Sequence, residues 1–182
     1  HRPVLSLFGD MSMWELPWRV LAFEELSHGH IMLRNPYTFS GMPFFAESQI
    51  AILYPVNWIH LLLPPDRAIN AIIALHTFLL GLFTYVWARY RDLSKPAGML
   101  AGVVMMFCGP FFLHLVPGHA THMAGMAWAP LLFLSCDLIL GQRYRDGLLL
   151  GSCSLAMQLL AGHPQYVYFT VIALCLYGVL RM

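Results

Sequence analysis

The hydrophobic and polar positions divide the chain into two parts. From residue 67 onward, apolar residues form five long runs separated by short polar linkers, at about 68–88, 97–116, 123–140, 147–161 and 166–181. Several of these runs reach or approach the ~20 residues that a helix needs to cross the hydrocarbon core of a membrane. Lipid offers no partner for free backbone groups, so the pattern predicts five transmembrane helices within residues 67–182.

Residues 1–66 have a different pattern, with seven prolines and no long, unbroken apolar run. We expect this segment to be a long loop with short helices that lie in the membrane interface. Residues 17–28 predict an amphipathic helix with a proline in its first turn and Gly29 as its stop. Residues 46–63 are apolar but interrupted by Pro55, and they predict a helix in the interface.

Composition supports a membrane protein. Hydrophobic residues make up 59% of the 182 residues and charged residues only 10%, whereas soluble domains carry about 25% charged residues. The predicted fold class is all-α: one polytopic transmembrane helix bundle with a long extracytoplasmic first loop, cut short at both ends. The net charge of +1 argues against a nucleic-acid partner, which requires a basic patch.

The basic residues predict the orientation of the bundle. Linkers 89–96 and 141–146 carry lysine or arginine, and Arg181 ends the last run. These three positions fall on one side of the membrane, and the opposite short loops, 117–122 and 162–165, contain neither lysine nor arginine. The positive-inside rule therefore places the basic ends in the cytoplasm and the long first loop outside.

Polar side chains capable of chemistry gather in the segments predicted to lie outside. They are Asp10, His114, His119, His122, His163 and Gln165. We therefore expect a site at the outer membrane boundary. Asp10 is a candidate general base, or alternatively an N-cap for residues 11–16.

His119 and His122 are three residues apart and would share a face if their loop is helical, as metal ligands require. Since two histidines without a third fixed ligand are a weak metal signal, hydrogen bonds to a phosphate or a loop carbonyl are favoured. No metal or other cofactor is predicted. His163 lies in a sharp turn, where its alternative role is to cap the flanking helices.

The arginines have competing interpretations. Arg19 and Arg34 could each hold a phosphate through two parallel hydrogen bonds. Alternatively, their stems cover apolar surface while their charged ends reach the lipid headgroups. At the cytoplasmic end, Asp137 is expected to form a structural pair with Arg143 or Arg145.

Short motifs along the whole chain resemble one family. They are Gly9-Asp10, Pro17-Trp18-Arg19, Arg34-Asn35-Pro36-Tyr37, Gly41-Met42-Pro43, Gln49, Tyr54-Pro55-Val56-Asn57, Gly118-His119, Ala127-Trp128-Ala129-Pro130 and Leu160-Ala161-Gly162-His163-Pro164-Gln165. In this order and spacing they resemble the bacterial YfhO family of polytopic membrane proteins, which is similar to the GT-C glycosyltransferases.

This resemblance implies an enzyme of the bacterial plasma membrane. Such an enzyme transfers a sugar from a polyprenyl-phosphate donor, at the outer face, to a cell-envelope polymer or lipid acceptor. The resemblance implies that Asp10 is the catalytic base, that a further helix precedes His1, and that the intact protein is much longer. The substrate and its phosphate would contact Arg19, Arg34, His119, His122, His163 and Gln165.

Two other functions remain open. A flippase or transporter for lipid-linked sugars predicts ionisable residues at mid-membrane facing a cavity, and His76 is the main candidate of that kind. A non-catalytic membrane scaffold predicts that replacing Asp10 affects folding or assembly but no chemical step.

Overall fold

The computed structural model describes Gly9 and residues 11–115 and 117–181. The described chain is mainly helical. Its α-helices are α1 (Leu16–Ser27), α2 (Pro65–Tyr90), α3 (Lys95–Met106), α4 (Gly109–Phe112), α5 (Ala120–Ala127), α6 (Ala129–Leu140), α7 (Tyr144–Leu160) and α8 (Pro164–Arg181). The smaller elements are a π-helical turn (Met11–Glu15), 3-10 helices at Ser48–Ile50, Pro55–Leu61 and Leu113–Leu115, and strands β1 (Arg34–Asn35) and β2 (Met42–Pro43), which pair antiparallel.

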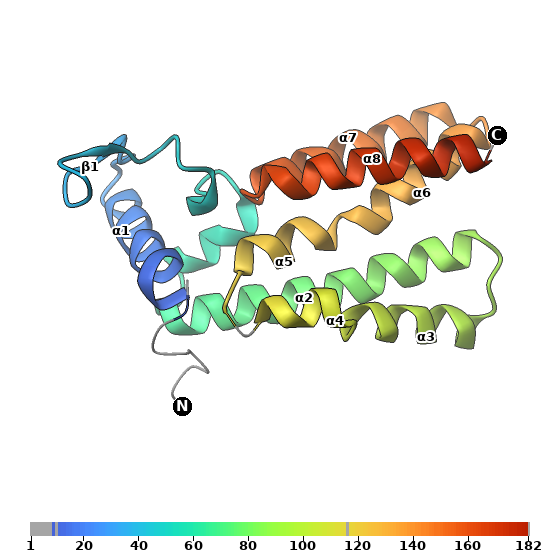
Figure 1. The fold of residues 1–182 in the computed structure, drawn as a ribbon, viewed down its shortest axis with the longest axis horizontal. Helices are drawn as coiled ribbons and strands as arrows, with labels where there is room; N and C mark the ends of the chain where they lie inside the picture. The colour runs from blue at the N-terminus through green and yellow to red at the C-terminus, as the bar shows by residue number, and fades with distance from the viewer. Residues whose placement is uncertain (1–8, 10, 116, 182) are drawn as a thin grey trace.

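The long helices lie side by side along the long axis of the molecule (Figure 1). Helices α2 and α3 form one layer, α7 and α8 form the opposite layer, and α5 and α6 pack between them. Helix α1 and the β1–β2 hairpin stand at one end of this bundle, where α1 contacts the start of α2 and the 3-10 helices of the first loop.

Three helical stretches of the described residues are long and apolar enough to cross a membrane: Pro65–Tyr90, Lys95–Leu115 and Ala120–Leu140. The second is interrupted before Gly109-Pro110, since α3 ends at Met106 and α4 begins at Gly109. The fourth and fifth predicted spans lie in α7 and α8, which have 17 and 18 residues and are shorter than the ~20 residues of a typical span.

Of the two helices predicted in the first loop, the structure has the first but not the second. Helix α1 starts with a proline in its first turn, and Gly29 follows it in the left-handed conformation, as predicted. The predicted helix over 46–63 is wrong, because the structure has two short 3-10 helices there. Ala51 separates them with a left-handed φ of 50°, and Pro55 supplies no N–H to continue a helical ladder.

A buried carboxylate ties together the bundle end that is remote from α1. The Asp137 side chain is 1% exposed and lies 3.5 Å from the Arg91 guanidinium and 3.4 Å from that of Arg181. It also accepts hydrogen bonds from Tyr177 Oη at 2.8 Å and Trp87 Nε1 at 2.9 Å. A buried charge needs such partners to offset its lost hydration, and these come from α2, the α2–α3 linker and α8.

The expected pairing of Asp137 with Arg143 or Arg145 is therefore wrong. Arg143 pairs instead with Asp146, three residues along the chain in the first turn of α7. This local pair forms because the linker before α7 is short and an acidic residue is favourable at a helix N-terminus. Arg145 is exposed.

Helices α2 and α3 approach closely through two glycines. A β-carbon built at Gly102 would lie 2.7 Å from the backbone oxygen of Gly81, and one built at Gly81 would lie 2.4 Å from Met106 Sδ. Small residues at a helix crossing allow the backbones this approach, which is the usual way for apolar helices to pack in lipid.

We expect Gly102→Val to separate α2 from α3 and lower the apparent melting temperature in detergent by roughly 5 °C, since forcing atoms into a packed interface costs ~1–3 kcal/mol. The control is Gly109→Ala, because a β-carbon at Gly109 meets nothing within 4 Å. Equal melting of Gly102→Val and wild type would show that the crossing is not close-packed.

Candidate functional site

Four histidines meet at the bundle end that lies next to α1. We call His114, His119, His122 and His163 the histidine cluster. Ring centroids lie 4.4 Å apart for His119 and His122, 4.9 Å for His114 and His122, and 3.8 Å for His122 and His163. The convergence of these histidines, predicted from the shared end of their helices, is confirmed.

The local backbone brings the first three histidines together. After the 3-10 turn Leu113–Leu115 the chain reverses, and the His119 N–H donates to the His114 carbonyl at 2.9 Å. Gly118 permits this reversal with a φ of 82°, and a β-carbon there would lie 2.4 Å from Met11 Cβ. Helix α5 then begins at Ala120 and places His122 one turn above His119.

The cluster is hydrogen-bonded internally and to its surroundings. His114 Nδ1 lies 3.1 Å from His119 Nδ1, and His114 Nε2 lies 2.8 Å from the Tyr166 hydroxyl. His163 Nδ1 is buried and has no hydrogen-bond partner among the residues that the structure describes. Burial lowers the pKa of His163, and the neighbouring His119 and His114 lower it further, which favours the neutral imidazole.

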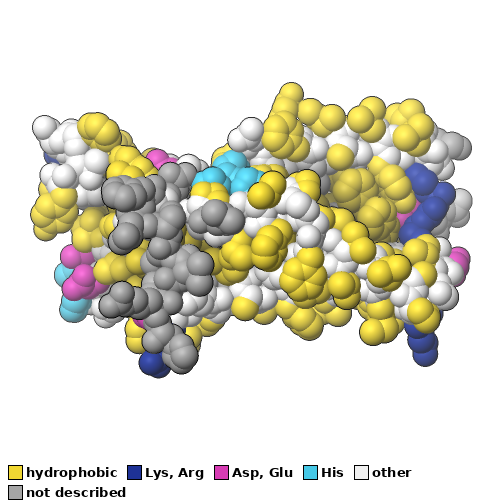
Figure 2. Space-filling model, turned by 60° about the horizontal axis from the view of Figure 1, so that its bottom comes forward, with side chains coloured by type: hydrophobic (Ala, Val, Ile, Leu, Met, Phe, Trp, Pro, Cys, Tyr) yellow, Lys and Arg dark blue, Asp and Glu magenta, His cyan; other side chains and the backbone are white. Residues whose placement is uncertain are grey.

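A pocket of about 450 Å³ opens beside the cluster. Its walls are Trp14, Glu15, Trp18, Glu47, Gln49, His119, His122 and His163. Figure 2 shows histidine side chains gathered on the surface between the N-terminal elements and the long helices, with arginine or lysine side chains at the far end of the bundle. Aromatic rings, carboxylates, an amide and imidazoles thus share one cavity, a combination suited to a polar ligand with an apolar face.

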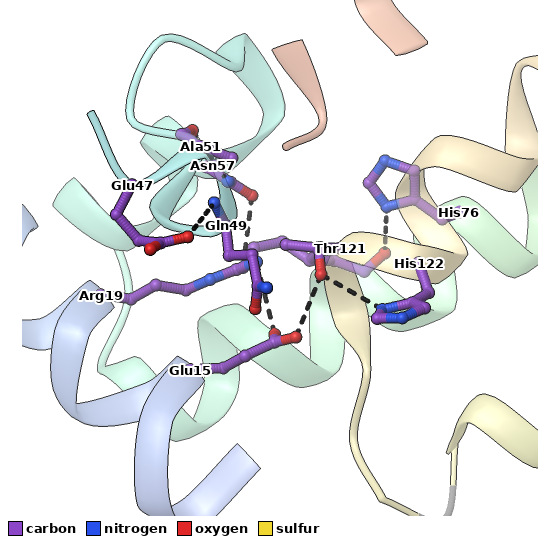
Figure 3. Close-up of polar contacts among 10 residues, drawn as sticks. Glu15, Arg19, Glu47, Gln49, Ala51, Asn57, His76, Thr121 and His122 are labelled. Carbon is purple, nitrogen blue, oxygen red and sulfur yellow. Dashed lines mark hydrogen bonds and ion pairs between the residues drawn. The ribbon is translucent and has the colours of Figure 1, made fainter. Parts of the chain in front are cut away.

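Next to this pocket, a buried ion pair at the start of α1 bonds to two other segments, and these bonds attach α1 to the bundle (Figure 3). Arg19, 1% exposed, lies 3.5 Å from the Glu15 carboxylate and donates to Asn57 Oδ1 at 3.4 Å. Thr121 Oγ1 of α5 donates to Glu15 Oε1 at 3.1 Å. Burial raises the pKa of Glu15 while Arg19 and Thr121 lower it, and burial lowers the pKa of Arg19 while Glu15 raises it.

A second buried network lies deeper. The Tyr54 hydroxyl bonds His76 Nε2 at 2.6 Å and accepts from Trp128 Nε1 at 2.9 Å, while His76 Nδ1 faces the Ile72 carbonyl at 2.7 Å. Burial raises the pKa of Tyr54 to about 12. Both nitrogens of His76, in the middle of α2, therefore have protein partners.

The predicted site residues fall into four groups. His119, His122 and His163 line the pocket, whereas Arg19 is buried next to it in the ion pair. Asp10 lies outside the described residues.

Arg34 and Gln165 are exposed and do not line the pocket. Arg34 belongs to the β1–β2 hairpin, where its guanidinium donates to the Ser40 carbonyl at 3.0 Å. Gln165 is in the first turn of α8.

Other pocket residues were not predicted as site residues. Trp14 and Trp18 are four residues apart, and their rings meet edge to face at 5.2 Å. Residues at this spacing lie on one helical face, so the pair was a signal available in the sequence. Glu47 and Gln49 carry no such signal, because the extended backbone at Glu47 and a short 3-10 turn bring them to the pocket.

Comparison with models of known protein families, with curated proteins and with solved structures finds no match. The chemistry of the pocket is therefore interpreted from its own residues and from the motifs of the sequence.

We expect Arg19→Met to be strongly destabilising, because it leaves the Glu15 carboxylate buried without its cation. Breaking a buried pair in this way costs about 3–5 kcal/mol. The double variant Glu15→Gln/Arg19→Met should recover much of this loss, and exposed Arg67→Met should change stability by less than about 0.5 kcal/mol. Thermal unfolding in detergent measures all three, and wild-type stability of Arg19→Met would exclude a structural role for the pair.

His60 makes stability depend on pH. Its ring stacks on Phe23 of α1 with centroids 5.1 Å apart, and burial together with the Arg19 charge lowers the pKa of His60 to about 4. In the unfolded chain the pKa is about 6.5, so the unfolded state binds more protons between these values. Stability should therefore fall as the pH drops from about 6.5 to 4.

The test is the melting temperature across this pH range. His60→Gln should show a smaller fall than wild type, whereas His30→Gln, at an exposed position, should behave as wild type. An unchanged pH profile for His60→Gln would show that another group causes the loss.

Proposed function

We propose that this chain is part of a polytopic membrane glycosyltransferase of the GT-C type, related to the YfhO family. It would transfer a sugar from a polyprenyl-phosphate donor to a cell-envelope polymer or lipid acceptor at the extracytoplasmic face. The observation that carries the proposal is the pocket of tryptophan, carboxylate, amide and imidazole side chains at one end of an apolar helix bundle.

The pocket has the chemistry of a sugar site. Its volume of about 450 Å³ lies within the roughly 300–1,000 Å³ of small-molecule sites. The rings of Trp14 and Trp18 offer flat apolar surface for the C–H face of a pyranose. Glu47 and Gln49 also line the pocket, with groups that bind hydroxyls.

A neighbouring cavity suits the lipid part of the donor. It has a volume of about 330 Å³ and is lined mostly by apolar residues of α2, α3, α5, α6 and α8. Tyr166 lines this cavity, and its hydroxyl bonds His114 of the cluster. A polyprenyl tail in the cavity would bring its phosphate to Tyr166 and the histidine cluster, where imidazole N–H groups could donate to it.

The distribution of charge supports the proposed orientation. Arg91, Arg143 and Arg181 lie at the end of the bundle opposite the histidine cluster. If α7 and α8 cross the membrane with the three longer apolar stretches, the positive-inside rule puts this arginine end in the cytoplasm. The pocket then faces the outside of the cell. A polyprenyl-phosphate-linked sugar is already activated, so the reaction there requires no nucleotide-linked sugar.

The proposed reaction is a displacement at the anomeric carbon. A carboxylate takes the proton of the acceptor hydroxyl as its oxygen bonds to that carbon. The bond from carbon to phosphate oxygen breaks, and polyprenyl phosphate leaves with the electron pair, its charge balanced by donors from the histidine cluster. Asp10 remains the proposed base on the family resemblance, and Glu47 is proposed to bind the sugar.

The test uses the full-length protein in lipid nanodiscs with polyprenyl-phosphate-linked radiolabelled glucose or N-acetylglucosamine as probes. Asp10→Asn should lower turnover about 100-fold or more with donor binding intact. Trp18→Ala and Glu47→Gln should raise KM roughly tenfold through lost sugar contacts. Trp58→Phe and Glu25→Gln, whose side chains do not line the pocket, are the matched controls.

The same preparation in proteoliposomes separates the alternatives. A flippase would move the lipid-linked sugar across the bilayer with its sugar–phosphate bond intact. A scaffold would neither cleave nor move it, and Asp10→Asn would then change only assembly. Full transfer activity of Asp10→Asn would refute the assignment of the base.

A further inference from the structure

Three members of the histidine cluster have the spacing of metal ligands. His114, His119 and His122 each offer one ring nitrogen, and the three nitrogens lie within 4.8 Å of one another. Two nitrogens bound to one tetrahedral zinc ion, each at about 2.0–2.1 Å, are roughly 3.3 Å apart. The Nδ1 atoms of His114 and His119 are already 3.1 Å apart, and the ligand nitrogen of His122 lies within 4.8 Å of the other two and must come closer to complete the set.

The outer nitrogens of two rings have partners of the kind that orient metal ligands. His114 Nε2 faces the Tyr166 hydroxyl at 2.8 Å, which leaves Nδ1 for an ion. His122 Nδ1 lies 3.5 Å from Thr121 Oγ1, which in turn bonds the Glu15 carboxylate. Metal-binding histidines almost always use their second nitrogen in such a contact, which fixes the tautomer and the ring orientation.

A neutral cluster also leaves lone pairs close together. When His114 and His119 are both uncharged, only one of the two facing Nδ1 atoms can donate to the other. His163 adds a buried Nδ1 without a partner among the described residues, on a ring whose centroid is 3.8 Å from that of His122. A metal cation among these rings would accept their lone pairs while the rings stay uncharged. Protonation of several rings would instead place repelling imidazolium charges next to one another.

We propose that His114, His119 and His122 bind a divalent transition-metal ion of the zinc class. Imidazole suits zinc and its neighbours, whereas magnesium and calcium prefer oxygen ligands, and the three-residue set contains none. Three protein ligands leave a fourth position for water or a substrate atom. Since His119 and His122 line the pocket, that position lies at the pocket wall.

Metal binding does not require the proposed transfer reaction, although it uses three of the histidines that are proposed above as donors to the leaving phosphate. The site requires only the three side chains, and it would hold an ion whether or not a sugar is transferred. The test therefore measures metal binding in the absence of any donor, so its failure would not refute the transferase, and failure of the transferase would not refute the site.

The experiment uses the full-length protein in detergent, stripped with a chelator and titrated with Zn²⁺ alone. Wild type should bind one ion per chain at high affinity. Co²⁺ in place of Zn²⁺ should give the visible absorption of a four-coordinate ion with nitrogen ligands. His114→Gln and His122→Gln should each weaken Zn²⁺ binding roughly 100-fold or more. The matched control is His28→Gln/His30→Gln, which removes two exposed histidines outside the cluster.

Melting temperatures separate lost binding from lost folding. Zn²⁺ should raise the melting temperature of wild type and of the His28→Gln/His30→Gln control, but not that of the two cluster variants. Should a cluster variant fail to fold, the cobalt spectrum of wild type still decides. Absence of a one-to-one high-affinity site, a spectrum of six oxygen ligands, or wild-type affinity in His114→Gln and His122→Gln would each overturn the proposal.

Discussion

The contact between Glu15, Arg19 and Thr121 holds the first loop on the helix bundle, and the pocket depends on it. Helix α1 buries an arginine where a surface helix would normally bury an aliphatic side chain, so its attachment is polar as well as apolar. Thr121 is the neighbour of His122, and Glu15 is the neighbour of Trp14. The hydrogen bond between Thr121 and Glu15, together with that from the Met11 N–H to the Pro117 carbonyl at 3.3 Å, therefore links the aromatic wall of the pocket to the histidine cluster.

The two ends of the bundle differ in the kinds of polar and charged groups that they hold. Arginines and Asp137 form the interactions at one end, whereas imidazoles, a tyrosine and the Glu15–Arg19 pair form those at the other. Between these ends, the helices pack through small residues and apolar side chains. This division leaves the histidine end without an excess of fixed positive charge, since Arg19 is balanced by Glu15, and a cation or a polar ligand can approach it.

The sequence predicted the features that depend on periodicity and on local turns. Alternation of apolar runs with short linkers was sufficient to bring His114, His119, His122 and His163 to one end, because successive helices reverse direction. It was not sufficient for the pocket walls. The first loop positions Trp14, Glu47 and Gln49, and its path depends on buried polar contacts such as that of Arg19 with Asn57. No periodic pattern in the sequence indicates that these residues pair. The partners of Asp137 were missed for the same reason, since Arg91 and Arg181 are distant in sequence and reach it only through helix packing.

Helix α8 is held at both of its ends by tyrosines. Tyr166 bonds His114 at the pocket end, and Tyr177 bonds Asp137 at the arginine end, eleven residues or about 16 Å away along the helix axis. These two hydrogen bonds oppose movement of α8 along its axis, because such a movement would break one of them. The end of the pocket that borders His163, directly before α8, is therefore held in place from both ends of this helix.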